Sequence, residues 1–193
     1  MFLYTVNAII FNMNMSDKQK RVDYYIGIAK QQLDQHTTHI DENILFIIGA
    51  LTYHGFEIQS ACGGHLSKRR QGVYIDIQFP KYSKMMEIYK TLTNQDKIEK
   101  HQETIDHQLA LLELQVIILL NDFYSQRKVK YENILIPVHR SNNLLRLQPV
   151  SSNIIGRFAD VDKRKMWLKD LNQELFDLGA FLFEKNPSKP NAA

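Results

Sequence analysis

Apolar and polar residues recur along this chain with two periods, and the first of them is helical. After the capping-box sequence Ser16-Asp17-Lys18-Gln19, apolar residues fall at helical spacing and predict a helix over residues 16–35. A second helix is predicted over residues 42–54, because Asp41 can cap its start and Gly55 can end it. Because this second segment is apolar almost throughout, we expect it to be deeply buried.

Four short segments follow the period of two that is typical of strands, at residues 56–60, 73–79, 133–138 and 144–150. The second is the clearest, because Val73, Ile75 and Ile77 alternate with Tyr74 and Asp76. This alternation predicts a strand with one buried face. A short helix is expected over residues 82–92, after the first pair of strands.

Residues 98–126 form the longest predicted helix, and they are apolar on two faces. One face is a heptad-like seam made of Ile105, Leu109, Leu112, Val116, Leu119 and Phe123. The second face holds Leu111, Leu114, Ile117, Ile118 and Leu120. The sheet can cover one face. The other is covered either by the leucine stripe of the last predicted helix, 160–184, or by a protein partner or a second copy of the chain.

The order of these elements, with strands in hairpin-like pairs, favours an α+β fold with a mainly antiparallel sheet of about four strands and helices packed on it. We expect one domain over residues 16–185 and a disordered polar tail over 186–193. Residues 1–15 carry no charge. They form either an extra strand or tail, or a segment ahead of a start at Met13 or Met15.

Composition excludes several classes of protein. The 193 residues are 44% hydrophobic and 23% charged, with a net charge of +3, as in an ordinary globular protein. A single cysteine excludes an internal disulfide framework and fits a cytoplasmic location. We expect no secretory signal and no membrane-spanning segment, because asparagines interrupt the apolar residues of the first segment.

The unusual chemistry of the chain gathers in the predicted loop from Ser60 to Arg70, between two strands. Cys62 and His65 are the candidate catalytic residues, because a thiol beside an imidazole can act as a nucleophile. The same two residues could begin a zinc site, with further ligands among His54, His101, His107, His139 and Asp76. Alternatively, Gly63 and Gly64 form a structural or binding turn. We expect binding or architecture, with no metal and no cofactor.

Two basic stretches are candidate nucleic-acid contacts. The first is Lys68-Arg69-Arg70, and the second includes Arg127, Lys128 and Lys130. The alternative is ordinary solvated surface charge. Arg146 and Gln148 share one face of a predicted strand, and they would form a polar patch if that face also carries Asp76 and Gln78.

No nucleotide-binding or hydrolase fingerprint is present in the chain. The run from Gly55 to His65, with the later Leu145-Arg146-Leu147-Gln148, resembles a family of uncharacterised bacterial proteins. In that family a strand ends in Ser-Cys-Glu-Gly-His and a late strand carries Arg-Leu-Gln. Here Ala61 is inserted and Gly63 replaces the acid. A second resemblance is to the Ser-Ser-Cys-Ser-Gly-Arg turn of TYW-three type methyltransferases of wybutosine synthesis. It is carried by Ser60, Cys62 and Gly64, and the Arg of that turn corresponds to His65 of this chain.

Together these patterns lead us to expect a non-enzymatic accessory subunit of a nucleic-acid-associated bacterial assembly, of the mobile-element or phage-defence type. Its protein partner, or a second copy, would bind through the helices 98–126 and 160–184, and DNA or RNA through the basic loops. The alternative is an RNA-modifying or related enzyme that uses the Cys62–His65 loop. A small zinc-stabilised domain is the third hypothesis.

Overall fold

The structure is a computed structural model, and it describes residues 15–34, 41–64, 72–79, 81–140, 143–151 and 159–187. Almost all of the predicted extension 1–15 and most of the tail 186–193 lie outside these ranges. So do His65, Lys68, Arg69 and Arg70.

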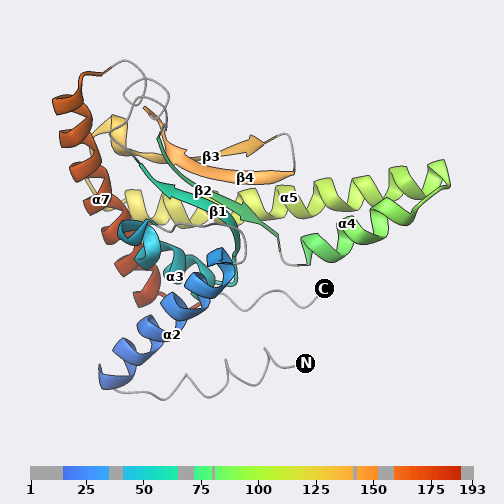
Figure 1. Cartoon of the computed structure of the whole chain (residues 1–193), viewed down its shortest axis with the longest axis horizontal. Coiled ribbons are helices and arrows are strands. Elements are labelled where there is room, and N and C mark those ends of the chain that lie inside the picture. The colour runs from blue at the N-terminus through green and yellow to red at the C-terminus, as the bar shows by residue number, and fades with distance from the viewer. Residues whose placement is uncertain are drawn as a thin grey trace.

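Helices and strands follow one another in the predicted order, and the α+β prediction is confirmed (Figure 1). The helices are α2 (Met15–Asp34), η2 (Glu42–Ile44), α3 (Leu45–Tyr53), α4 (Tyr82–Thr91), α5 (Gln95–Tyr124), η3 (Tyr131–Asn133) and α7 (Val161–Glu184). The strands are β1 (Glu57–Gly63), β2 (Val73–Gln78), β3 (Leu135–Arg140) and β4 (Leu144–Pro149).

The four strands form one antiparallel sheet in the order β1-β2-β4-β3. The pairing of β1 with β2 is irregular, because Ile58 lies opposite Ile77 while Ser60 lies opposite Asp76. Gln59 is therefore the extra residue of a β-bulge. Beyond the bulge, Ser60 points to the same face as Asp76. Side chains alternate along both strands, so the face opposite the core becomes polar at this point.

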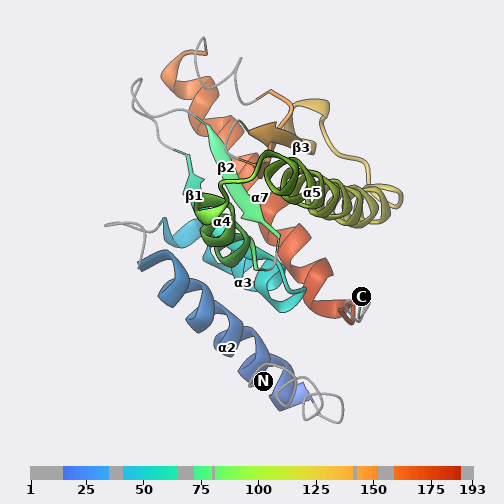
Figure 2. The same cartoon turned by 90° about the vertical axis from the view of Figure 1, so that its right-hand side faces the viewer.

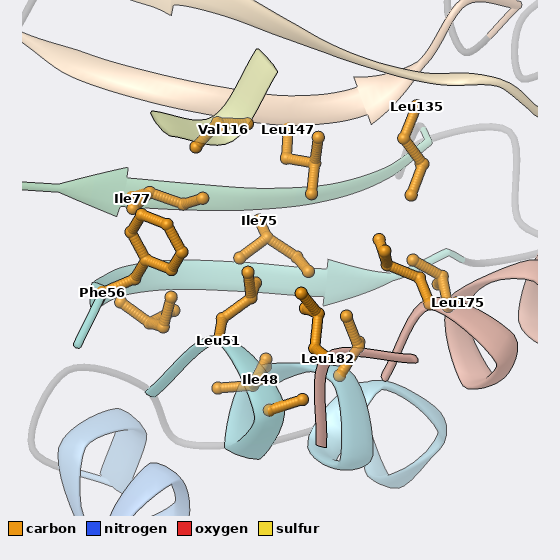
Figure 3. Packing of buried hydrophobic residues seen from close by; sticks show 14 of the residues in the cluster. Ile48, Leu51, Phe56, Ile75, Ile77, Val116, Leu135, Leu147, Leu175 and Leu182 are labelled. Atoms are coloured by element: carbon orange, nitrogen blue, oxygen red, sulfur yellow. The ribbon is translucent and has the colours of Figure 1, made fainter. Parts of the chain in front are cut away.

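Helices α3, α5 and α7 pack against one face of the sheet, and α2 packs on the outside of α3 (Figure 2). Ile48 and Leu51 from α3 meet Leu175 and Leu182 from α7 below the strands (Figure 3). On the strand side the core holds Ile75, Ile77 and Leu147, while α5 contributes Val116. The second predicted helix is buried as expected, because it is enclosed by α2, α7 and β1.

The leucine stripe of α7 is used inside this core, so it does not cover the second apolar face of α5. Leu171, Leu175, Leu178 and Leu182 are at most 1% exposed. Two assignments on α5 were wrong: Leu120 is buried with the core seam, whereas Leu119 is only partly buried. The two lie next to each other near the edge of the buried stripe, where a heptad count drifts from the true helical period.

Helix α4 and the first part of α5 form a hairpin that extends beyond the sheet (Figure 1). One stripe of α4 is half-buried, and it contains Tyr82, Met85, Met86 and Tyr89. The imidazole of His101 on α5 lies 2.8 Å from the carbonyl oxygen of Met85. Because few of its residues are fully buried, we expect this hairpin to have a lower local stability than the rest of the described chain.

Candidate functional site

A buried ion pair occupies the polar face of the sheet, where β2 and β4 lie side by side. Asp76 and Arg146 are register partners. The Nε and Nη2 atoms of Arg146 donate to the two carboxylate oxygens of Asp76 at 2.6 Å each. The hydroxyl of Ser60 donates to the same carboxylate at 2.7 Å. The predicted patch of Arg146 with Asp76 therefore forms, and β1 adds Ser60 to it.

Tyr74 and Cys62 complete the surroundings of Arg146. The guanidinium lies 3.8 Å from the centre of the Tyr74 ring, and Tyr74 is the register partner of Cys62. Hydrogen bonds with Asp76 raise the pKa of Arg146 above its usual value. Only 6% of the Asp76 side chain and 18% of the Arg146 side chain are exposed. Each charge is already satisfied by the other, so this cluster stabilises the sheet more readily than it binds an outside ion.

Gly63 and Gly64, predicted as binding residues, have clear structural roles. Strand β1 continues through Cys62 to Gly63, so the predicted strand end at Ser60 was wrong. The strand is longer because Cys62 and Gly63 still pair with Tyr74 and Val73 of β2. In addition, the Gly63 N–H donates to the Asp41 carboxylate at 2.7 Å, and its carbonyl accepts from the Asn43 amide at 3.1 Å. A Cβ on Gly63 would collide with Asn43. Gly64 has a φ of +86°, which favours glycine.

The second basic stretch carries less free positive charge than the sequence suggests. Arg127 contacts the carboxylates of Glu174 at 3.2 Å and Asp177 at 2.7 Å, and Lys130 contacts Asp170 at 2.5 Å. Lys128 is exposed. Because these carboxylates come from α7, the cations join the segment after α5 to α7. Because Arg127 and Lys130 are already paired with carboxylates, they are less available to bind a phosphate group.

Three of the histidines proposed as extra zinc ligands, His54, His101 and His139, have other partners. His54 contacts the carbonyl oxygen of Leu182 at 2.7 Å, and His139 contacts Glu113 at 2.8 Å. Burial lowers the pKa of His54 below its usual value. In the part of the chain that the structure describes, no three His, Cys, Asp or Glu side chains gather to hold a metal. His65 lies outside this part, so its role stays a prediction.

Two features were not predicted. A shallow hollow of about 350 Å³ lies between the sheet and α4, lined by Gln59, Gln78, Tyr82, Met86, Lys90 and others. In addition, Arg164 is 3% exposed, at the start of α7. A signal for Arg164 was present, because it stands four residues before Leu168 and continues the leucine stripe toward the start of the helix.

Comparison with known proteins does not identify this chain. No protein-family model matches it, no curated protein matches it, and no solved structure matches it. Among the described residues, no helix is both long and apolar enough to cross a membrane. The resemblance based on the run from Gly55 to His65 therefore remains a prediction. Function has to be argued from the chain's own surfaces.

Proposed function

We propose that this protein is a non-enzymatic interaction subunit that associates through the outer face of α5. One observation carries the proposal: four large apolar side chains lie together on that face. Leu111, Leu114, Ile117 and Ile118 are 41%, 53%, 42% and 58% exposed. They recur at helical spacing opposite the buried seam, and we call them the α5 strip. A contiguous exposed apolar surface of this kind is typical of a protein-binding site.

The occupant that fits the α5 strip is a second copy of the chain, with the two α5 helices antiparallel. In a pair centred midway between Leu114 and Ile117, Leu114 of one copy lies opposite Ile117 of the other. Glu103 stands eleven residues before Leu114, and Lys128 stands eleven residues after Ile117. Both are exposed. Glu103 would then lie about 19 Å from the centre along the helix, beyond the end of the other copy's α5 and toward the segment that carries Lys128.

The apolar surface of the α5 strip limits a dimer to weak and reversible association. The exposed fractions of the α5 strip add up to about two whole side chains. Complete burial of two such side chains contributes about 3–6 kcal/mol per copy. Loss of translational and rotational freedom costs about 4–15 kcal/mol, which is similar to the roughly 6–12 kcal/mol that the two strips could supply together. We therefore expect association that depends on protein concentration.

Ile118→Glu tests the proposal directly, because it places a charge at the most exposed position of the α5 strip. The wild type should form dimers in sedimentation equilibrium, and Ile118→Glu should be monomeric. Its thermal unfolding should stay cooperative, with a midpoint that no longer depends on protein concentration. Met166→Glu is the matched control, since Met166 is 70% exposed on α7. That variant should dimerise like the wild type.

The antiparallel arrangement has its own test in the charges at its ends. Glu103→Lys and Lys128→Glu should each weaken the dimer through like charges, whereas the double variant should restore it. A wild type that stays monomeric at all concentrations would refute self-association. The alternative of an enzyme using the Cys62–His65 loop would then take first place.

We extend the proposal to a nucleic-acid-associated assembly, supported by the sequence Lys68-Arg69-Arg70 and by exposed Lys128. Affinity for an oligonucleotide should fall steeply with salt, because phosphate contacts release counterions. Replacing the three residues 68–70 by alanine should flatten the salt dependence, while Lys130→Ala should change it little, since Lys130 holds Asp170. Absence of binding at low salt would remove this part of the proposal.

A further inference from the structure

A buried arginine with no salt-bridge partner among the described residues lies at the start of α7. Arg164 is 3% exposed, and its Nε has no hydrogen-bond partner among the residues that the structure describes. Its backbone N–H donates to the carbonyl of Asp160, so the residue belongs to the first turn of the helix. The side chain stands on the buried stripe that continues through Leu168 and Leu171.

A second unsatisfied donor lies one turn further along the same side of α7. Trp167 is 6% exposed, and its indole Nε1 has no partner within the described chain. Residues three apart are neighbours on a helix surface, so Arg164 and Trp167 stand next to each other on α7. The 3-10 turn η3 packs against α7 and brings Asn133, which is 4% exposed with an unpartnered side-chain oxygen.

Burial without a partner is costly for each of these groups, and most costly for the charge. Buried arginines in proteins are normally paired with a carboxylate or bind an anion. Here the first-turn amide of Lys163 is already capped by the Asp160 carboxylate at 2.8 Å. The unmet donors are therefore on the side chains of Arg164 and Trp167, whereas Asn133 holds an unmet acceptor among the described residues.

We propose that Arg164 and Trp167 form a binding site for a phosphate group at the start of α7. A tetrahedral oxyanion accepts hydrogen bonds from several directions at once, so it can satisfy the guanidinium and the indole together. A phosphate also supplies the negative charge that Arg164 lacks. Leu168, the next stripe residue, packs near Gly64, so the site adjoins the end of β1. This proposal is independent of association through α5.

Trp167 is the only tryptophan of the chain, so its fluorescence reports on this site alone. We would titrate the full chain with inorganic phosphate at constant ionic strength, using chloride as the control salt. The wild type should show a saturable change in emission and a rise in thermal midpoint. A nucleoside monophosphate and a single-stranded oligonucleotide, added at equal phosphate concentration, would tell a free phosphate from a nucleic-acid backbone.

Arg164→Met separates a binding site from a structural arginine. Without phosphate, this variant should melt at or above the wild-type midpoint, because it removes an unpaired buried charge. It should also lose the phosphate response. Lys165→Met is the matched control, since it removes an exposed cation from the next position and should keep the full response.

Three results would overturn the proposal. One is a wild type whose fluorescence and thermal midpoint ignore phosphate and both other probes. Another is an equal phosphate response in Arg164→Met and the wild type. The third is a marked loss of stability of Arg164→Met in phosphate-free buffer, which would mean that a group of the protein already satisfies the guanidinium.

Discussion

Asp76→Asn should destabilise the fold strongly, because it removes the charge that balances Arg146. Both oxygens of Asp76 receive hydrogen bonds of 2.6 Å from this guanidinium. Removing one partner of a buried ion pair costs about 3–5 kcal/mol. Arg146 keeps 18% side-chain exposure and its stacking on Tyr74, so we expect the lower end, about 3 kcal/mol. For a chain of this size that corresponds to a fall in thermal midpoint of about 6–12 °C.

Thermal and urea unfolding, followed by circular dichroism, would measure this loss in a double-mutant cycle. Arg146→Met alone should also be destabilising, because it leaves the Asp76 carboxylate unpaired. The double variant should lose less than the sum of the two single losses, with a coupling of about 2 kcal/mol or more. Asp170→Asn is the control for an exposed pair with Lys130, and it should change the midpoint little. Additive losses within the cycle would contradict the buried-pair interpretation.

Two further predictions concern a glycine and a histidine. Gly63→Ala should lower the free energy of unfolding by about 2–4 kcal/mol, because its Cβ would displace Asn43 from two hydrogen bonds. Gly27→Ala in α2 is the control: its Cβ would meet open space, so it should raise the free energy of unfolding by about 0.5–1 kcal/mol. Equal effects of the two variants in urea unfolding would contradict the role of Gly63. Since the pKa of His54 is lowered in the fold, its neutral form contributes stability above pH 6.5 that is lost as the pH falls through the lowered value. His54→Gln should therefore lose less stability than the wild type between pH 7 and pH 5, and a parallel decline in both would argue against this role.

Sequence patterns identified every α-helix and every strand described here, but local hydrogen bonds decided where several of them begin and end. The long helix starts at Gln95, not at residue 98, because the side chain of Asn94 accepts from the Lys97 N–H and caps it. The third strand starts at Leu135, since residues 131–133 form a 3-10 turn. Such caps and turns depend on one or two side chains, which a hydrophobic period does not register.

Part of the polar cluster could be predicted, and part could not. The period of two placed Asp76 on the polar face of one strand and Arg146 on one face of another. Nothing in the sequence set the register that places them opposite each other. The contact of Gly63 with Asp41 and Asn43 joins residues about twenty positions apart, so no local pattern could have indicated it. Arg164 was overlooked because a charged residue was not expected within an apolar stripe.

The bulge at Gln59 has a consequence for how the length of this chain can vary. Ile58 lies before it and packs in the core, whereas Ser60 and Cys62 lie after it on the polar face. Deleting Gln59 would remove the bulge and make Ile58 and Ser60 neighbours on opposite faces, still opposite Ile77 and Asp76. Asp76 would keep its hydrogen bond from Ser60. The strand can therefore lose one residue at this point without turning a core residue outward, which most single-residue deletions within a strand would do.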